Sequence, residues 1–231
     1  MAPEGALAEG EQELGTQVLC HGLVWALLLG SVNLALSRAA KGRPKGWLAR
    51  RVSGGFFNMP AHMYVVASCG QTFIQPALWS LAFFGRDSGA AWWFGAQAQW
   101  AVGEFLAHSF GYFMQDALVH MAENSPLVLL HHVASAFAAW LLTQGSGWRG
   151  FLLTVAQAME LGSLAAELGD LGFLPRRPAA LALLATSVAP AAVTLGSAFL
   201  SPPPDLASGF IVLAIPVVGF LRSQEAMKLV G

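Results

Sequence analysis

The chain has 231 residues, of which 55% are hydrophobic and only 11% are charged, and its net charge is -1. Soluble domains average about 25% charged residues, so we expect lipid rather than water to cover part of this protein. The lack of a cationic excess argues against a nucleic-acid partner. Two cysteines, Cys20 and Cys69, are too few for a disulfide framework or a CxxC metal site.

The sequence opens with an acidic segment, residues 1–16, which contains glutamates but no lysine or arginine. A signal peptide needs a basic front end, and the apolar run that follows, Gln17–Ser37, is long enough to cross a bilayer. We therefore predict a retained membrane helix here, and one multi-pass membrane domain over residues 17–231.

Seven apolar stretches approach the roughly 20 residues that one bilayer-spanning helix needs. They are Gln17–Ser37, Met59–Phe84, Trp92–Val119, Leu127–Thr143, Gly150–Leu171, Pro178–Leu200 and Leu206–Leu221. The last stretch is short and contains Pro216, so six helices are the alternative. Pro76 and Pro190 lie inside other stretches, and each is expected to remove a backbone hydrogen bond and kink its helix. The predicted fold class is an all-α membrane protein with six to seven transmembrane helices.

The distribution of lysine and arginine predicts the orientation, because cytosolic loops carry an excess of these residues. The segment Arg38–Arg51 contains six of the 12 cations, and only Arg86 and Arg149 fall on the opposite side when the amino terminus is non-cytosolic. The segment after Leu221, with Arg222 and Lys228, then lies in the cytosol. We predict a non-cytosolic amino terminus and a cytosolic carboxy terminus.

Ionisable side chains at membrane depth are the main functional signal, because each costs about 2.5–3.5 kcal/mol at the bilayer centre on insertion scales. One set follows steps of four residues: Glu104, His108, Tyr112, Asp116 and His120. Residues four apart stay near one face of a helix, although the face drifts slowly. We therefore expect a polar stripe that avoids lipid.

Two later stretches carry further polar groups. His131 and His132 are adjacent, so their side chains point about 100° apart and only one of them aims at a given centre. Glu160 and Glu167 are seven residues apart and lie close to one helix face. We predict that Asp116, His131 and Glu160 face one another in a polar chamber.

Buried polar residues in membrane bundles often serve only to hydrogen-bond neighbouring helices together. We expect this structural role for Glu104, Gln115 and Gln157. Asp116, His131 and Glu160 suit either the structural or the functional role.

The segment Gly111–Asp116, which reads GYFMQD, and the segment Leu130–His132, which reads LHH, together resemble the signature of the TLC-domain family of membrane proteins. The resemblance covers residues from about 50 to 228, and its distinctive part runs from Gly111 to Glu160. It implies a helical bundle around a lipid-sized cavity in the endoplasmic reticulum or another internal membrane. The implied partner is a membrane lipid, such as a sphingolipid, an acyl-CoA or a phospholipid.

Ceramide synthases of this family join a fatty acyl thioester to a sphingoid amine, using paired histidines and a later His-Asp pair. His131 and His132 match the paired histidines, and Asp116 matches the upstream acid. The later pair is missing, because the stretch Gly150–Leu171 contains no histidine. The run Glu160–Ser163, which reads ELGS, instead resembles the non-synthase TLC-domain-containing proteins.

We therefore expect a protein of lipid binding, sensing or lipid homeostasis. Its predicted lipid-binding residues are Glu104, His108, Tyr112, Asp116, His131 and Glu160. The alternative is a ceramide-synthase-like N-acyltransferase, in which His131 or His132 is the base or nucleophile and Asp116 orients it. No HExxH or HxxHH cluster supports a metal-dependent hydrolase, so we expect neither a metal nor a cofactor. A transporter is a further alternative, because intramembrane acids often mark ion pathways.

Overall fold

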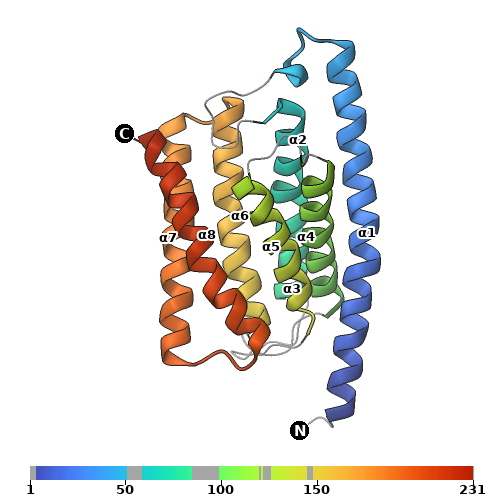
Figure 1. Ribbon diagram of the computed structural model, residues 1–231, viewed down its shortest axis with the longest axis vertical. Helices are drawn as coiled ribbons and strands as arrows, with labels where there is room; N and C mark the ends of the chain where they lie inside the picture. Colours follow the sequence, from blue (N-terminus) through green and yellow to red (C-terminus); the bar gives the residue numbers. More distant parts are fainter. Residues whose placement is uncertain are drawn as a thin grey trace. The chain divides into compact units, whose positions relative to one another are not determined.

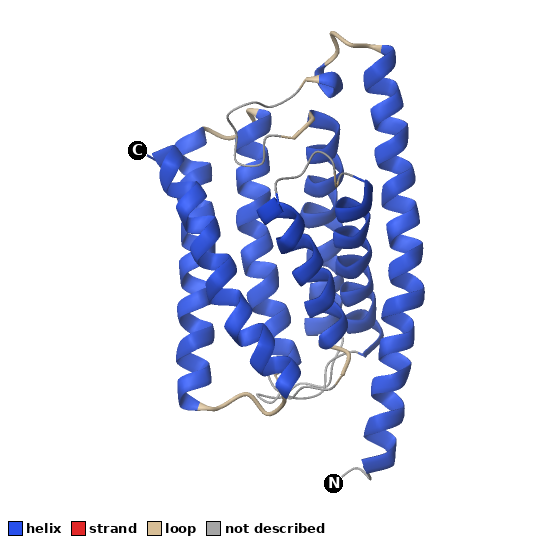
Figure 2. Cartoon of the chain, in the orientation of Figure 1, coloured by secondary structure: helices blue, strands red, loops and turns tan. Residues whose placement is uncertain are grey.

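A computed structural model describes residues 4–50, 59–84, 99–119, 121, 126–144 and 148–230, and its regular elements there are helices (Figures 1 and 2). In chain order they are α1 (Glu4–Gly42), the 3-10 helix η1 (Trp47–Ala49), α2 (Ala61–Cys69), the π-helical turn η2 (Gly70–Ile74), α3 (Gln75–Phe84), α4 (Gln99–Val119), α5 (Pro126–Leu141), α6 (Arg149–Leu171), α7 (Arg176–Leu200) and α8 (Leu206–Val230). The predicted all-α class is confirmed for these residues. α1 already begins within the acidic segment of residues 1–16.

Four helical segments are long and apolar enough to cross a membrane: Gln12–Gly42, Arg149–Leu171, Arg176–Leu200 and Leu206–Lys228. Leu129–Leu141 is a shorter apolar helix. These segments fit a multi-pass membrane protein. The predicted span Met59–Phe84 is helical from Ala61 to Phe84 and contains a π turn, and the predicted span Trp92–Val119 is helical over its described part, Gln99–Val119, and carries several polar residues.

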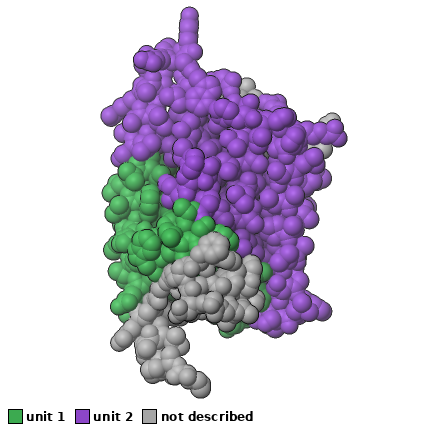
Figure 3. Space-filling model, turned by 180° about the vertical axis from the view of Figure 1, so that it is seen from behind, with its two compact units in different colours: residues 1–30, 77–153, 203–211 green, residues 31–76, 154–202, 212–231 purple. Residues whose placement is uncertain are grey.

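The chain divides into two compact units, which are coloured in Figure 3. Unit 1 comprises residues 1–30, 77–153 and 203–211, and unit 2 comprises residues 31–76, 154–202 and 212–231. Four of the five boundaries between the units fall inside α1, α3, α6 and α8, so each of these helices contributes to both, and the fifth lies between Pro202 and Pro203, in the connection from α7 to α8.

In unit 1, the apolar side chains of α1 divide between a buried and an exposed face. Leu14 and Val18 are buried, whereas Leu23, Val24 and Leu27 are more than half exposed. Exposed leucines and valines in such density would be costly in water and are favourable in hydrocarbon. The outer face of α1 therefore fits a lipid environment.

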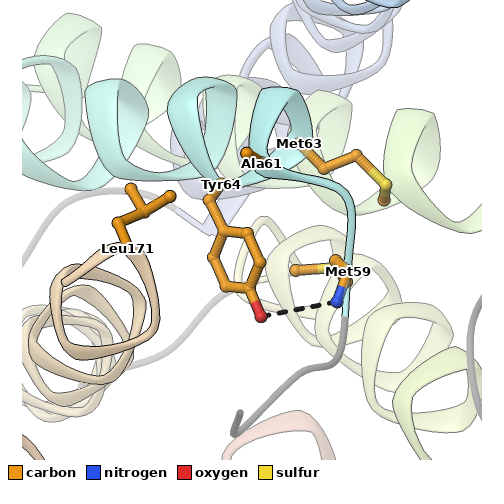
Figure 4. Close-up of a cluster of buried hydrophobic side chains, with 5 residues drawn as sticks. All are labelled: Met59, Ala61, Met63, Tyr64 and Leu171. Atoms are coloured by element: carbon orange, nitrogen blue, oxygen red, sulfur yellow. Dashed lines mark hydrogen bonds between the residues drawn. The ribbon is translucent and has the colours of Figure 1, made fainter. Parts of the chain in front are cut away.

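In unit 2, a buried cluster joins α2 to the end of α6 (Figure 4). Met59, Ala61, Met63 and Tyr64 pack there with Leu171. Tyr64 is fully buried, and its hydroxyl accepts a hydrogen bond from the backbone nitrogen of Met59 at 3.4 Å. This cluster fixes the start of α2 against α6.

The π turn η2 lies immediately before Pro76, where the sequence predicted a kink. The backbone nitrogen of Gln75 donates to the carbonyl of Gly70, five residues back, as a π-helical bond requires. Proline has no N–H and its ring collides with the carbonyl four residues earlier in a regular α-helix. The wider π turn avoids this clash, so the chain continues as a helix into α3.

Candidate functional site

The first polar group of unit 1 lies between α1 and α4. Glu104 accepts a hydrogen bond from Gln17 Nε2 at 3.0 Å and makes a close ion-pair contact with His21 Nδ1. One turn further along α4, His108 is 1% exposed and meets Trp25 edge to face, with ring centroids 5.0 Å apart. Glu104 thus has the structural role that its sequence position suggested.

The second polar group of unit 1 lies between α4 and α5. Asp116 Oδ2 is 2.8 Å from His132 Nδ1, and the two side chains are only 8% and 10% exposed. The imidazole ring is turned so that Nδ1 makes no well-aligned hydrogen bond. At this separation the carboxylate attracts the ring in its protonated form. Tyr112 and Phe113 flank the ring of His132.

The helical period explains why the predicted stripe on α4 divides between these two groups. Each residue turns the helix by about 100°, so a step of four residues drifts by about 40°. Three such steps separate Glu104 from Asp116, and the accumulated drift is about 120°. Glu104 and His108 therefore face α1, whereas Asp116 lies beside a histidine of α5. His120, the last residue of the stripe, lies outside the described residues.

The paired histidines occupy different surroundings. The ring of His131 meets Phe113 edge to face at 5.8 Å, and its Nδ1 is 3.5 Å from Ser135 Oγ. The two imidazole centroids are 5.6 Å apart. The sequence interpretation placed His131 opposite Asp116, whereas the described ion-pair partner of Asp116 is His132.

Gly111, which begins the GYFMQD segment, has a packing role of its own. A Cβ atom at this position would lie 2.4 Å from the carbonyl oxygen of Gly22 and 2.9 Å from the backbone nitrogen of Ala26. The backbones of α1 and α4 therefore touch here, as small residues allow in membrane helix pairs. The residue that follows, Tyr112, points toward the His132 side of α4.

Unit 2 contains a ladder of three hydrogen bonds between the α2–η2 segment and α6. Tyr64 Oη donates to Asp170 Oδ2 at 2.7 Å. Ser68 Oγ donates to Glu167 Oε2, and Gln71 Nε2 donates to Glu160 Oε2, each at 2.8 Å. The donors advance along the chain as the acceptors recede, so the two segments run antiparallel. The acceptors were identified from the sequence as polar, but their three donors were not.

Arg222 also belongs to unit 2, where it connects α8 to α6 and α7. Its Nη1 donates to Ser163 Oγ at 2.9 Å, its Nη2 to the carbonyl of Met159 at 2.5 Å, and its Nε to Ser187 Oγ at 3.3 Å. A Cβ atom on Gly162 would lie 1.8 Å from Thr186 Oγ1 and 3.1 Å from Nη2, so glycine allows the close approach of Thr186 and leaves room for the guanidinium. The predicted apolar stretch stops at Leu221, whereas α8 continues to Val230 and contains this arginine.

The six predicted lipid-binding residues thus fall into three groups. Glu104 and His108 lie between α1 and α4, Tyr112, Asp116 and His131 lie at the α4–α5 contact, and Glu160 belongs to unit 2.

Within the described residues, no group of three histidine, cysteine, aspartate or glutamate side chains is arranged to hold a metal ion. The resemblance of the sequence to the TLC-domain signature rests on residues of the α4–α5 site and on their order in the chain. Comparisons with protein-family models, curated proteins and solved structures find no match to this chain.

Proposed function

We propose that this chain is a TLC-type membrane protein that binds a membrane lipid, with the lipid headgroup at the α4–α5 site. The observation that carries the proposal is the buried pair of Asp116 and His132, 2.8 Å apart. Burying an ion pair costs desolvation energy that good geometry only partly returns. Such a pair at membrane depth is a functional candidate by default, and these residues are the ones that resemble the family signature.

The chemistry of the site suits a headgroup that both donates and accepts hydrogen bonds. An imidazolium donates to a phosphate or carbonyl oxygen, and a carboxylate accepts from a hydroxyl, amide or ammonium group. Tyr112 adds a phenolic hydroxyl at the same contact. Sphingolipids and phospholipids carry these groups, and an acyl-CoA carries phosphate and amide groups. The acyl chains would extend along the apolar faces of the helices.

The proposal includes the membrane arrangement inferred from the sequence. The chain crosses an internal membrane, such as the endoplasmic reticulum, six or seven times around a polar-lined, lipid-sized cavity. Its amino terminus is non-cytosolic and its carboxy terminus cytosolic. Both Arg222 and Lys228 lie within α8, but the Arg38–Arg51 segment, which carries six of the 12 cations, still dominates the charge bias.

An acyltransferase is the second candidate, because a histidine beside a carboxylate is a competent general base near neutral pH. His132 would accept the proton of a sphingoid amine as the amine attacks the acyl thioester, and the coenzyme A thiolate would leave. Asp116 would stabilise the imidazolium formed in that step. Binding ranks first because the later His-Asp pair of the synthases is absent from Gly150–Leu171.

Mass spectrometry of lipids that co-purify in mild detergent tests the proposal. We expect the wild-type protein to retain a lipid, and the His132→Asn variant to retain less of it. The His62→Asn variant, altered at a buried histidine of unit 2 outside the α4–α5 site, is the matched control and should retain the wild-type amount. Equal lipid content in all three proteins would refute headgroup binding at the α4–α5 site.

Incubation with an acyl-CoA and a sphingoid base separates binding from catalysis. We expect no N-acylated product from the wild-type protein, and His131→Asn should express and retain lipid nearly as the wild type does. A product that forms with the wild type and disappears in His131→Asn or His132→Asn, at normal protein levels, would reverse the ranking in favour of the acyltransferase.

A further inference from the structure

Unit 2 contains a buried polar group of its own, at the π-helical turn η2. Gln71, the second residue of this turn, is 3% exposed, and its Nε2 donates to Glu160 Oε2 at 2.8 Å. Its Oε1 makes no hydrogen bond within the part of the chain that the structure describes. Single π turns inside α-helices are frequent at functional sites. The turn thus holds a buried amide oxygen close to a carboxylate.

Gln157, three residues before Glu160 on α6, supplies a second buried amide without a described hydrogen-bond partner. It is 6% exposed, and neither its oxygen nor its nitrogen bonds to any described residue. It precedes Glu160 by three residues on α6, and residues at this spacing are neighbours on a helix surface. The expectation that Gln157 bonds a neighbouring helix is therefore wrong, and so is the same expectation for Gln115, whose amide bonds no described residue. Native proteins satisfy nearly all buried polar groups, and these two amides differ from the unbonded Gln115 amide in that each is tied to the same carboxylate, Gln71 by a hydrogen bond and Gln157 by its helical spacing.

We propose that Gln71 Oε1, Gln157 Oε1 and the Glu160 carboxylate bind a monovalent cation. Amide and carboxylate oxygens are the preferred ligands of hard cations, and helix irregularities inside membranes commonly form such sites. The shared chemistry is a single positive charge, carried either by an alkali ion or by the primary ammonium of a lipid headgroup. A single carboxylate in the set favours a monovalent over a divalent ion, because divalent sites usually combine several carboxylates.

Arg222 limits the affinity of this site without occupying it. The guanidinium is held by Met159, Ser163 and Ser187, and its charge acts on Glu160 through space. A second positive charge near the carboxylate weakens cation binding by repulsion. We therefore expect a modest affinity that responds to the removal of either amide.

The test compares wild-type protein with Gln157→Leu and Gln115→Leu in nanodiscs of phosphatidylcholine and phosphatidylglycerol. Thermal unfolding is measured during titration with sodium or potassium chloride, at an ionic strength held constant with N-methyl-D-glucamine chloride. Gln115 is the matched control, since it is a buried glutamine of unit 1 that also lacks a described hydrogen-bond partner. A repeat in nanodiscs that contain phosphatidylethanolamine supplies a primary ammonium.

Three outcomes decide the proposal. A rise in the unfolding temperature with sodium or potassium, with an apparent affinity about tenfold weaker in Gln157→Leu and unchanged in Gln115→Leu, supports an alkali-ion site. If the unfolding temperature rises only in nanodiscs that contain phosphatidylethanolamine, and this rise is weakened in Gln157→Leu but not in Gln115→Leu, the ligand is a lipid ammonium group. The proposal is overturned if the unfolding temperature depends on neither cation, or if the Gln157→Leu variant shows the same cation dependence as the wild type. Either result means that only water contacts these amides. Because Gln157 lies in unit 2, lipid retention in the His132→Asn experiment tests the α4–α5 site separately.

Discussion

Replacing Gly111 with alanine should force α1 and α4 apart at their closest contact. The new Cβ atom would lie 2.4 Å from the carbonyl oxygen of Gly22, where ordinary contact begins at 3.4 Å, so the helices must separate by about 1 Å. The obstructing atoms include backbone, which cannot rotate away as a side chain can. Overpacking of this kind costs about 1–3 kcal/mol, and the gain in helix propensity from glycine to alanine returns up to about 1 kcal/mol.

The Gly30→Ala variant is the matched control for this prediction. Its Cβ atom would lie 3.5 Å from Gln115 Cγ, which is an ordinary contact. This variant should therefore gain about 0.5–1 kcal/mol from helix propensity alone. Thermal unfolding in one detergent compares the two proteins with the wild type. If both substitutions raise the unfolding temperature equally, the backbone contact at Gly111 is not part of the folded protein and the reasoning fails.

Three further predictions concern the ion pair, the arginine and the orientation. Asp116→Leu should lower the free energy of unfolding by about 1–3 kcal/mol, because it leaves a buried imidazole without its polar neighbour, and adding His132→Leu should recover part of the loss; a double-mutant cycle by thermal unfolding that finds no coupling would contradict this. Arg222→Lys should cost about 1–3 kcal/mol, because one ammonium cannot replace a guanidinium that reaches three acceptors on α6 and α7, and wild-type stability of this variant by the same assay would argue against the contacts. Single cysteines placed within Arg38–Arg51, in a chain otherwise free of cysteine, should react with impermeant reagents only from the cytosolic side; labelling from the lumenal side would exclude the predicted orientation.

Hydropathy predicted most of the described helices, because burial of apolar side chains in lipid acts over whole segments. The clearest difference is at the end of α8, which continues past the predicted apolar stretch Leu206–Leu221 to Val230. An apolar stretch by definition stops before a charged residue such as Arg222, whereas the helix does not. Here Ser163, Ser187 and the Met159 carbonyl accept hydrogen bonds from this arginine, and those acceptors lie on helices far away in the sequence.

The sequence predicted which residue types form the candidate site better than it predicted which residues contact one another. Steps of four residues correctly identified Glu104 and Asp116 as polar positions on α4, but the accumulated helical drift places them on different faces. Adjacency showed that only one of the paired histidines aims at a given centre, and the orientation of α5, which the sequence does not specify, selects His132 for Asp116. The donors to Glu160 and Glu167 were missed because glutamine and serine give no separate signal in an apolar segment.

The contacts of Arg222 have a consequence for how the protein is synthesised. An arginine in the middle of a membrane helix costs about 2.5–3.5 kcal/mol during insertion, unless partners for its N–H groups are already in the membrane. α6 and α7 precede α8 in the chain, so both leave the ribosome before it and can present Ser163, Met159 and Ser187 to the arriving helix. α8 should therefore enter the bilayer efficiently behind these two helices, and poorly when it is fused alone to a reporter that scores insertion.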